Sequence, residues 1–216
     1  MATKSNCYCC GKTVTKGYAK RHCLSHNYTD SDCENCALLK IEDAYDTDYW
    51  LYVDIGLKNT LRDLDGFLRN IWLECCGHMS AFYQKHHEKI PFSRKMNSFE
   101  EGSVLLYDYD FGSTTTLKIT FVGQTTRKKQ SKKNSVRLLL RNEPFIFKCS
   151  CGKTAEYVCN ECDWDDNYPF YCKECVEKHE NEVEHYPLPV VNSPRMGVCG
   201  YTGERDTYTF NPDDYT

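Results

Sequence analysis

The sequence lacks a long apolar run, a strong excess of charge of either sign and a glycine-rich loop of the kind that cradles phosphate. No stretch of about 18 consecutive apolar residues occurs, so we expect no membrane-spanning helix and no membrane partner. Residues 1–6 are polar, which predicts a protein without a secretory signal and favours a cytoplasmic location. The 27 Lys and Arg residues are balanced by 31 Asp and Glu residues. The resulting net charge of -4 argues against nucleic-acid binding through overall positive charge.

Cysteine, by contrast, is abundant, with 15 residues in a chain of 216. Such a content indicates either disulfides in a secreted protein or metal sites in a reducing compartment. Most of the cysteines fall in short pairs, and most of the seven histidines lie beside them. Without a secretory signal, this arrangement favours metal.

Composition divides the chain into three regions. Residues 1–36 hold six cysteines and two histidines, and residues 148–216 hold seven cysteines and two histidines. Residues 37–147 hold only two cysteines and have the pattern of an ordinary folded domain. We therefore expect a small N-terminal zinc finger over residues 1–36, a central domain over residues 37–147, and a C-terminal zinc module with an extended tail over residues 148–216.

The central region predicts an α+β fold. Residues 49–55 alternate as a strand, with Leu51, Val53 and Ile55 on one face. A helix with a capping signal at Thr60 and Asp63 follows, and its apolar stripe runs to Trp72. Residues 104–109, 115–122, 135–140 and 144–147 are predicted to add strands to the sheet.

The N-terminal region contains a metal-ligand pattern of the form C-x2-C-x11-H-x3-H. Two thiolates on a tight turn and two imidazoles one helical turn apart can complete a tetrahedron around Zn²⁺. The predicted ligands are Cys7, Cys10, His22 and His26. The pattern resembles a two-Cys, two-His zinc finger, with a loop one residue shorter than usual. Cys33 and Cys36 form another pair and remain an alternative to the two histidines, whereas Cys9 and Cys23 are expected not to be ligands.

The C-terminal region offers eight potential ligands in four pairs, enough for two tetrahedral zinc sites. Their order and separations resemble the B-box zinc-binding module, with one residue instead of two inside the first pair. The resemblance implies interleaved sites and an interaction module, not a catalytic one. One site would hold Cys149, Cys151, Cys172 and Cys175, and the other would hold Cys159, Cys162, His179 and His185. With the N-terminal finger, we expect about three zinc ions per chain.

Residues 48–122 carry a family resemblance of their own. Tyr107, Tyr109, Asp110, Phe111 and Gly112 match a Tyr-x-Tyr-Asp-Phe-Gly motif on a strand, after a helix whose start matches at Thr60, Leu61 and Leu64. In these residues the region resembles the plasmid ORF-3-like family, also labelled TnpR-like, of uncharacterised bacterial proteins. Ser113 stands where that family often has Asp. The resemblance implies no established reaction.

Two groups in the central region are candidates for chemistry. Asp108 and Asp110 are two residues apart on a predicted strand, so they would share one face and could hold a metal or a proton. The second group is Cys75, Cys76 and His78 at the end of the predicted helix, where burial or a structural role is the alternative to a nucleophile. Cys199, far along the tail, is expected to be buried and unreactive.

A basic tip between two predicted strands is the clearest candidate for phosphate contacts. It consists of Arg127, Lys128, Lys129, Lys132 and Lys133. A solvated hairpin loop is the alternative. Taken together, the sequence predicts a zinc-binding interaction or adaptor protein that binds a protein partner, with nucleic acid as a further candidate. An enzyme using Asp108 and Asp110, or Cys75, Cys76 and His78, is the alternative function.

Overall fold

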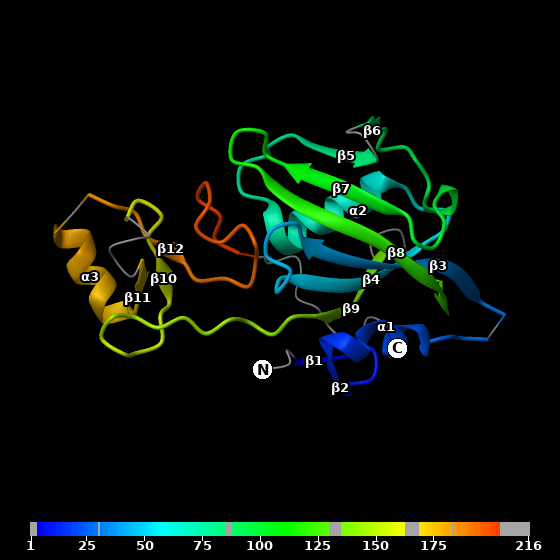
Figure 1. Ribbon diagram of the computed structural model, residues 1–216, viewed down its shortest axis with the longest axis horizontal. Helices are drawn as coiled ribbons and strands as arrows, with labels where there is room; N and C mark the ends of the chain where they lie inside the picture. The colour runs from blue at the N-terminus through cyan, green and yellow to red at the C-terminus, as the bar shows by residue number, and fades with distance from the viewer. Residues whose placement is uncertain are drawn as a thin grey trace. The chain divides into compact units, whose positions relative to one another are not determined.

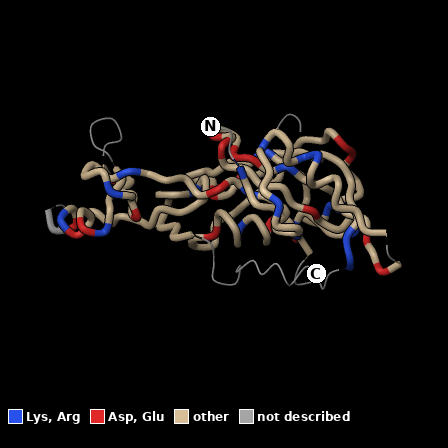
Figure 2. Tube along the Cα trace, turned by 90° about the horizontal axis from the view of Figure 1, so that it is seen from below, with Lys and Arg blue, Asp and Glu red and all other residues tan. Residues whose placement is uncertain are grey.

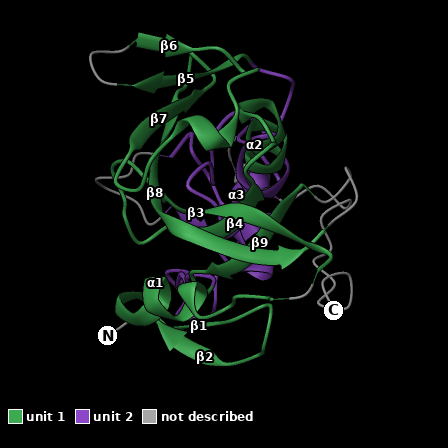
Figure 3. Cartoon of the chain, turned by 90° about the vertical axis from the view of Figure 1, so that its right-hand side faces the viewer, with its two compact units in different colours: residues 1–69, 79–143, 209–216 green, residues 70–78, 144–208 purple. Residues whose placement is uncertain are grey.

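The computed structural model describes residues 4–29, 31–84, 88–129, 135–162, 169–182 and 184–203. These residues divide into two compact units (Figure 3). The first unit contains the described residues up to Arg69 and those from Met79 to Glu143. The second contains residues 70–78 and the described residues from Pro144 onward. Among the described residues, no helix combines the length and the apolar character that crossing a membrane would need.

The first unit is built on a seven-stranded antiparallel sheet with the order β6-β5-β7-β8-β3-β4-β9 (Figure 1). Its strands are β3 (Cys33–Asp43), β4 (Trp50–Gly56), β5 (Ser80–Gln84), β6 (Glu88–Ile90), β7 (Val104–Tyr109), β8 (Thr115–Lys128) and β9 (Val136–Arg141). A short 3-10 turn, η3 (Met96–Ser98), lies between β6 and β7. Both strands and helices are present, so the fold is mixed α+β with a predominance of sheet.

One face of the sheet is covered by α2 (Leu61–Leu68). The helix begins with a capping box, in which the backbone N–H of Thr60 donates to Asp63 Oδ2 at 2.7 Å. Its leucines are buried, and Asp65 accepts a hydrogen bond from the hydroxyl of Tyr107 on β7. The chain then continues into a π-helical turn, η1 (Arg69–Leu73), with which it enters the second unit.

The opposite face of the sheet is covered by the N-terminal finger, as Figure 3 shows. This finger consists of the hairpin β1 (Lys4–Asn6) and β2 (Thr13–Thr15) followed by α1 (Lys16–Leu24). Its apolar residues pack with residues of β3, β4, β8 and β9 into one buried cluster. The cluster contains Cys7, Val14, Ala19, Cys23, Leu38, Trp50, Tyr52, Val122, Leu139 and Leu140. Strand β4 therefore lies between helix and finger, and all seven of its residues are buried.

The finger approaches the sheet closely at one glycine. Gly123 follows a bulge at which the register between β3 and β8 shifts. A Cβ atom at Gly123 would lie 2.8 Å from Leu24 Cδ2, at the end of α1. Glycine at this position therefore allows α1 to pack directly on the sheet.

The second unit combines a small three-stranded sheet with one helix. Its elements are β10 (Tyr157–Val158), β11 (Phe170–Tyr171), α3 (Lys173–Glu182) and β12 (Leu188–Pro189). The sheet has the order β11-β10-β12. Residues 70–78 are held in this unit by hydrogen bonds to the C-terminal segment. The indole Nε1 of Trp72 donates to the carbonyl of Asn192 at 3.1 Å, and the hydroxyl of Ser193 donates to the carbonyl of Trp72 at 2.6 Å.

The predicted strands at residues 49–55, 104–109 and 135–140 and the helix from Thr60 are present, with boundaries shifted by at most one residue at their starts. Strand β8 extends to Lys128, six residues beyond the predicted end. The predicted strand over residues 144–147 is absent, and this prediction is wrong. In this segment Pro144 has no N–H to donate to a sheet, and the ring of Phe147 instead stacks on Phe170 at 4.2 Å.

Candidate metal centres

Four clusters of cysteine and histidine in the described residues could hold a metal ion. In each cluster, four ligand atoms lie within 4.8 Å of one another. The clusters are Cys7, Cys10, His22 and His26; Cys149, Cys151, Cys172 and Cys175; Cys159, Cys162, His179 and His185; and Cys75, Cys76, His78 and Cys199. The first three are the sets that the sequence predicts, and the fourth is new.

The separations between ligand atoms fit a tetrahedral metal. Tetrahedral bonds of about 2.3 Å to sulfur and 2.0–2.1 Å to nitrogen place two sulfurs about 3.8 Å apart and a sulfur and a nitrogen about 3.5 Å apart. In the first cluster, Cys7 Sγ lies 3.3 Å from His26 Nε2, and Cys10 Sγ lies 3.6 Å from His22 Nε2. In the second, the sulfurs of Cys151 and Cys172 are 3.6 Å apart. One metal ion can therefore bond to all four ligand atoms of a cluster.

The first cluster is assembled by a tight turn and a helix. The backbone N–H of Gly11 donates to the carbonyl of Cys7 at 2.7 Å, and the N–H of Cys7 donates to the carbonyl of Lys12 at 2.9 Å. Gly11 has φ of +69°, a conformation that glycine adopts without strain. The turn presents both sulfurs on one side, and α1 presents His22 toward them.

Cys9 lies in this turn but is not in the cluster. The side-chain hydrogen bond with Cys9 is the largest influence on the Cys7 thiol and lowers its pKa to about 2, against the effect of burial. The same hydrogen bond, together with burial, raises the pKa of Cys9. Cys7 is thus favoured as the thiolate, the form that binds metal, while Cys9 stays protonated.

Cys33 and Cys36, the alternative ligand pair, are not part of any cluster in the described residues. Both belong to β3, where side chains three positions apart point to opposite faces of the sheet. One metal ion cannot reach both from a strand. The structure instead brings His22 of α1 and His26, two residues after its end, to Cys7 and Cys10.

The two clusters of the C-terminal module are interleaved along the chain, as the B-box resemblance implies. The turn at Cys149 is similar to that of the finger but one residue shorter. The N–H of Gly152 donates to the carbonyl of Cys149, and Gly152 has φ of +86°. Burial disfavours the Cys149 thiolate, but backbone hydrogen bonds from Cys151 and Cys172 outweigh it and lower its pKa to about 6. Cys172 precedes α3, and Cys175 lies in its first turn. The helix therefore fixes the second half of this cluster.

The other cluster of the module joins the segment between β10 and β11 to His179 in α3 and to His185 after the helix. Cys162 Sγ lies 3.5 Å from His179 Nε2, and Cys159 Sγ lies 3.5 Å from His185 Nδ1. The ring of Tyr171 stacks on His179 at 4.4 Å between centroids, and its hydroxyl lies 3.5 Å from Cys162 Sγ. Tyr171 thereby orients two ligands, as residues next to metal ligands commonly do.

The fourth cluster brings Cys199 to Cys75, Cys76 and His78, which the sequence had suggested as a group on their own. Cys199 is exposed, so the expectation that it is buried is wrong. One sequence signal could have indicated this cluster, namely a cysteine followed by glycine. This pair occurs at Cys10, Cys76, Cys151 and Cys199, and each of these cysteines belongs to a cluster. All four of these glycines have positive φ. Because Cys76 and Cys199 are 123 residues apart in the sequence, their spacing did not indicate that they belong to one cluster.

The basic tip differs from the prediction at Arg127. This side chain is 1% exposed and pairs with Asp54 at 2.7 Å and with Glu34 at 2.9 Å. The Arg127 guanidinium therefore forms ion pairs inside the protein, and the prediction that it contacts phosphate is wrong. Lys128 is exposed, and Lys129 pairs with Asp32 at 3.0 Å on the surface. Lys132 and Lys133 lie outside the described residues.

Basic residues of the finger also have acidic partners in the first unit. Lys16 lies 3.6 Å from Glu42, and Lys20 lies 3.2 Å from Glu101. Figure 2 shows basic and acidic residues interspersed along the described trace.

Asp108 and Asp110 do not form the predicted pair on one strand face. Strand β7 ends at Tyr109, and Asp110 is buried with φ of +64°, outside the extended conformation. The Asp110 carboxylate accepts the N–H of Gly112 at 3.0 Å, and Asp108 accepts the hydroxyl of Thr116 at 2.7 Å. The Asp110 carboxylate thus accepts a hydrogen bond from the turn, and the Asp108 carboxylate accepts one from the neighbouring strand β8.

The tyrosines of the same motif belong to a polar network. Asp65 accepts hydrogen bonds from the hydroxyls of Tyr107 and Ser80 and pairs with Arg69. The guanidinium of Arg69 lies 4.9 Å from the centre of the Tyr109 ring. Burial, followed by the charge of Asp65, raises the pKa of Tyr107. The network connects α2 to β5 and β7, which accounts for these polar residues without a reaction.

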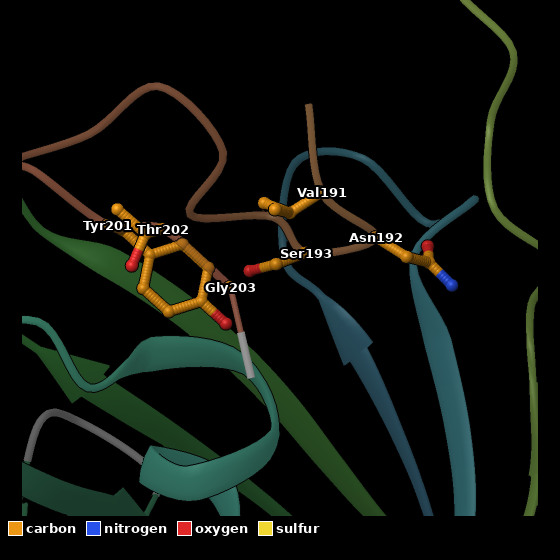
Figure 4. Close-up of a pocket in the computed structure, with 6 residues that line it drawn as sticks. All are labelled: Val191, Asn192, Ser193, Tyr201, Thr202 and Gly203. Atoms are coloured by element: carbon orange, nitrogen blue, oxygen red, sulfur yellow. The ribbon is translucent and has the colours of Figure 1, made fainter. Parts of the chain in front are cut away.

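Among the described residues, cavities also lie away from the clusters. One of about 270 Å³ is lined by Val191, Asn192, Ser193, Tyr201, Thr202 and Gly203 (Figure 4). None of these side chains is a carboxylate, an imidazole or a thiol. A second cavity of about 600 Å³ is lined by Cys33, Glu34, Asn35, Leu57, Lys58, Asn97 and Lys129. Glu34 in this second cavity already pairs with Arg127.

Comparisons with known proteins add little. No family model matches the chain, and no curated protein matches it. The chain is similar to the crystal structure of a protein of unknown function from Methanosarcina mazei Go1, with 19% sequence identity and a TM-score of 0.40. The match covers 45% of this chain and about 65% of the length of that one. No comparison supports the resemblance to the ORF-3-like family, which stays a prediction from the sequence motif.

Proposed function

We propose that the chain is a zinc-binding interaction protein whose metal ions are structural. The observation that carries this proposal is the completeness of the ligand sets: each cluster offers four protein ligand atoms within 4.8 Å of one another. A catalytic zinc ion keeps one position open for water or substrate, whereas a structural zinc ion is bound by four protein ligands. Thiolate and imidazole together are the ligands that Zn²⁺ prefers.

In this proposal, zinc organises each end of the chain. The N-terminal cluster is a two-Cys, two-His finger, and the two interleaved clusters form a B-box-like module. Between them lies the ORF-3-like α+β domain. Free thiols at all the cysteine ligand positions suit a reducing, cytoplasmic location.

The finger serves the fold of its own unit rather than the reading of DNA. The buried face of its helix packs on the sheet through Ala19 and Cys23. Lys16 and Lys20 already pair with acidic residues, so a DNA phosphate would have to displace these carboxylates. A finger in this position stabilises the unit by keeping Trp50 and Tyr52 out of water.

The C-terminal module is the part that binds a protein partner. Modules of the B-box type are chiefly interaction modules, and this one presents large apolar side chains to solvent. Tyr186 is 79% exposed, and Ile146, two residues before the module in the same unit, is 75% exposed. Tyrosine is among the residues that contribute most at protein interfaces. Nucleic-acid binding through Lys128, Lys129, Lys132 and Lys133 is the alternative, and the buried Arg127 weakens it.

Site-specific crosslinking tests the proposal. A photoreactive amino acid replaces Tyr186 in the full chain, expressed in cells of the source organism, and replaces Tyr45 in a matched control. Tyr45 is 86% exposed and belongs to the first unit. We expect a discrete protein adduct from position 186 that is absent from position 45 and absent when Cys159→Ser removes a ligand of the module.

The alternative predicts a different result. Fluorescence anisotropy with duplex DNA, single-stranded DNA and RNA at low salt would show binding of the wild-type chain. Replacing the four lysines with alanine would then weaken it on every sequence, because phosphate contacts carry no base information. That result, combined with no adduct at position 186, would replace the protein-partner proposal with a nucleic-acid one.

A further inference from the structure

The geometry points to a fourth zinc site, formed by Cys75, Cys76, His78 and Cys199, that fastens the C-terminal segment to residues 70–78. This site adds a fourth ion to the three that the sequence indicates. It rests on the same zinc chemistry as the proposed function, but the experiment below separates the two. All four ligands belong to the second unit.

The ligand atoms are arranged as a tetrahedral ion requires. Cys76 Sγ lies 3.6 Å from the sulfurs of both Cys75 and Cys199. His78 Nε2 lies 3.1 Å from Cys76 Sγ and 3.2 Å from Cys199 Sγ. These separations are close to the edges of a tetrahedron with about 2.3 Å bonds to sulfur and about 2.0 Å bonds to nitrogen.

The backbone is shaped to present these ligands. Cys199 has φ of +49°, a conformation that few residues other than glycine adopt. Gly200 follows with φ of +67°, and the N–H of Tyr201 donates to the carbonyl of Val198 at 3.0 Å. This is a tight turn with two left-handed residues at its centre, and it directs the Cys199 sulfur to the cluster. Gly77, with φ of +78°, makes the corresponding bend between Cys76 and His78.

Hydrogen bonds away from the ligands hold the two segments in place. Trp72 bonds to Asn192 and Ser193, and the hydroxyl of Tyr201 donates to the carbonyl of Ile71 at 3.4 Å. Trp72, Ser193 and Tyr201 are almost completely buried. The approach of Cys199 to residues 75–78 is therefore supported by packing that is independent of a metal ion.

The charge around the cluster suits a bound Zn²⁺ ion. Three thiolates and a neutral imidazole leave a zinc site with one net negative charge. The guanidinium of Arg195, whose residue is buried, lies with one nitrogen 3.6 Å from Cys75 Sγ. A cation bonded to a ligating sulfur compensates this charge and fixes the position of the ligand.

The fourth site is also the most accessible. Cys76 and Cys199 are exposed and the other two ligands are half-buried, whereas each of the other clusters contains at least one buried ligand. A chelator therefore reaches this ion first. Loss of this ion would remove the link between Cys76 and Cys199, which closes a loop of more than 120 residues. The stability of the second unit should therefore fall.

Native mass spectrometry of the full reduced chain tests the site. We expect four zinc ions in the wild type and three in both Cys199→Ser and His78→Ala. His78→Cys, which keeps four ligands, should retain four ions. Cys33→Ser, which changes a half-buried cysteine outside the clusters, is the matched control and should also retain four. Titration with a mild chelator should release one ion ahead of the rest, and this early step should be missing in Cys199→Ser.

Three ions in both the wild type and Cys199→Ser would overturn the fourth site while leaving the proposed function intact. A chain with three ions and a disulfide between Cys76 and Cys199 in fresh reduced protein would overturn it as well. If Cys199→Ser lost more than one ion, the two His78 variants would test the site instead. Fewer than four ions in His78→Cys would then contradict a role for His78 as a ligand. No zinc in any variant would contradict the proposed function itself.

Discussion

The Nη1 atom of Arg127 lies 2.7 Å from Oδ1 of Asp54, and both side chains are at most 1% exposed. Arg137 bonds to the other oxygen of the same carboxylate, with its Nε at 3.0 Å. One buried carboxylate on β4 thus pairs with two buried guanidiniums from β8 and β9, and Glu34 supplies a second negative charge to Arg127. This explains why a residue that begins a basic run in the sequence is not part of a surface patch.

Asp54→Asn should destabilise the first unit by about 3–5 kcal/mol, because the buried guanidiniums would lose their shared counter-charge. Urea unfolding followed by tryptophan fluorescence measures the loss. Asp32→Asn is the matched control, since it removes the carboxylate from an exposed pair with Lys129, and should cost less than about 1 kcal/mol. Similar losses for the two variants would show that burial of the Asp54 pair does not matter.

Loss of the metal ion from the finger should expose the sheet on which the finger packs. His26→Ala removes a ligand of the first cluster, so the finger should lose its metal ion and unfold. Hydrogen exchange should then accelerate in β4 and β9, whose Trp50 and Leu139 pack under the finger. Cys33→Ser provides the control with all ligands intact. Loss of one zinc ion with unchanged exchange in β4 would mean that the finger does not support the sheet.

The close approach of α1 to β8 predicts a coupled pair of mutations. Gly123→Ala should destabilise the first unit by about 1–3 kcal/mol, because alanine is strained at the φ of +156° found here and its methyl group would meet Leu24 at 2.8 Å. Leu24→Ala in the same chain should recover part of this loss by making room. A double-mutant cycle based on unfolding free energies measures the coupling. Strictly additive effects would place the finger farther from the sheet than the structure has it.

The C-terminal module should unfold independently of the first unit. Cys159→Ser removes a ligand, and zinc supplies most of the folding free energy of so small a module. Limited proteolysis should then cut quickly after Glu143, while the fragments of the first unit persist. Ser150→Ala, a neighbour of two ligands, should leave the pattern unchanged. Equally fast digestion of both units in Cys159→Ser would contradict their division.

The sequence predicted the α+β character and those elements with a strong local signal. Helix α2 was marked by Thr60 and Asp63, which form the capping box, and β7 by its alternating residues. Strand β3 was missed. Its Cys33 and Cys36 have the spacing of metal ligands, which concealed a strand that starts at Cys33. Local spacing cannot distinguish a ligand pair from two cysteines on opposite faces of a strand.

The three predicted ligand sets depended on pairs that are close in sequence. The fourth cluster depends on Cys199, which meets Cys76 only because Trp72, Ser193 and Tyr201 pack together. No periodicity or spacing reports such a contact. The same limit explains Arg127, because its buried partner Asp54 belongs to a distant strand.

Zinc content of the intact chain, measured by native mass spectrometry together with Zn K-edge absorption, tests the central claim most directly. The account predicts four zinc ions per chain, each bound by four sulfur or nitrogen ligands and none by water or another oxygen ligand. A folded, reduced chain that carries one ion or none, or whose zinc has oxygen ligands at an open position, would contradict it.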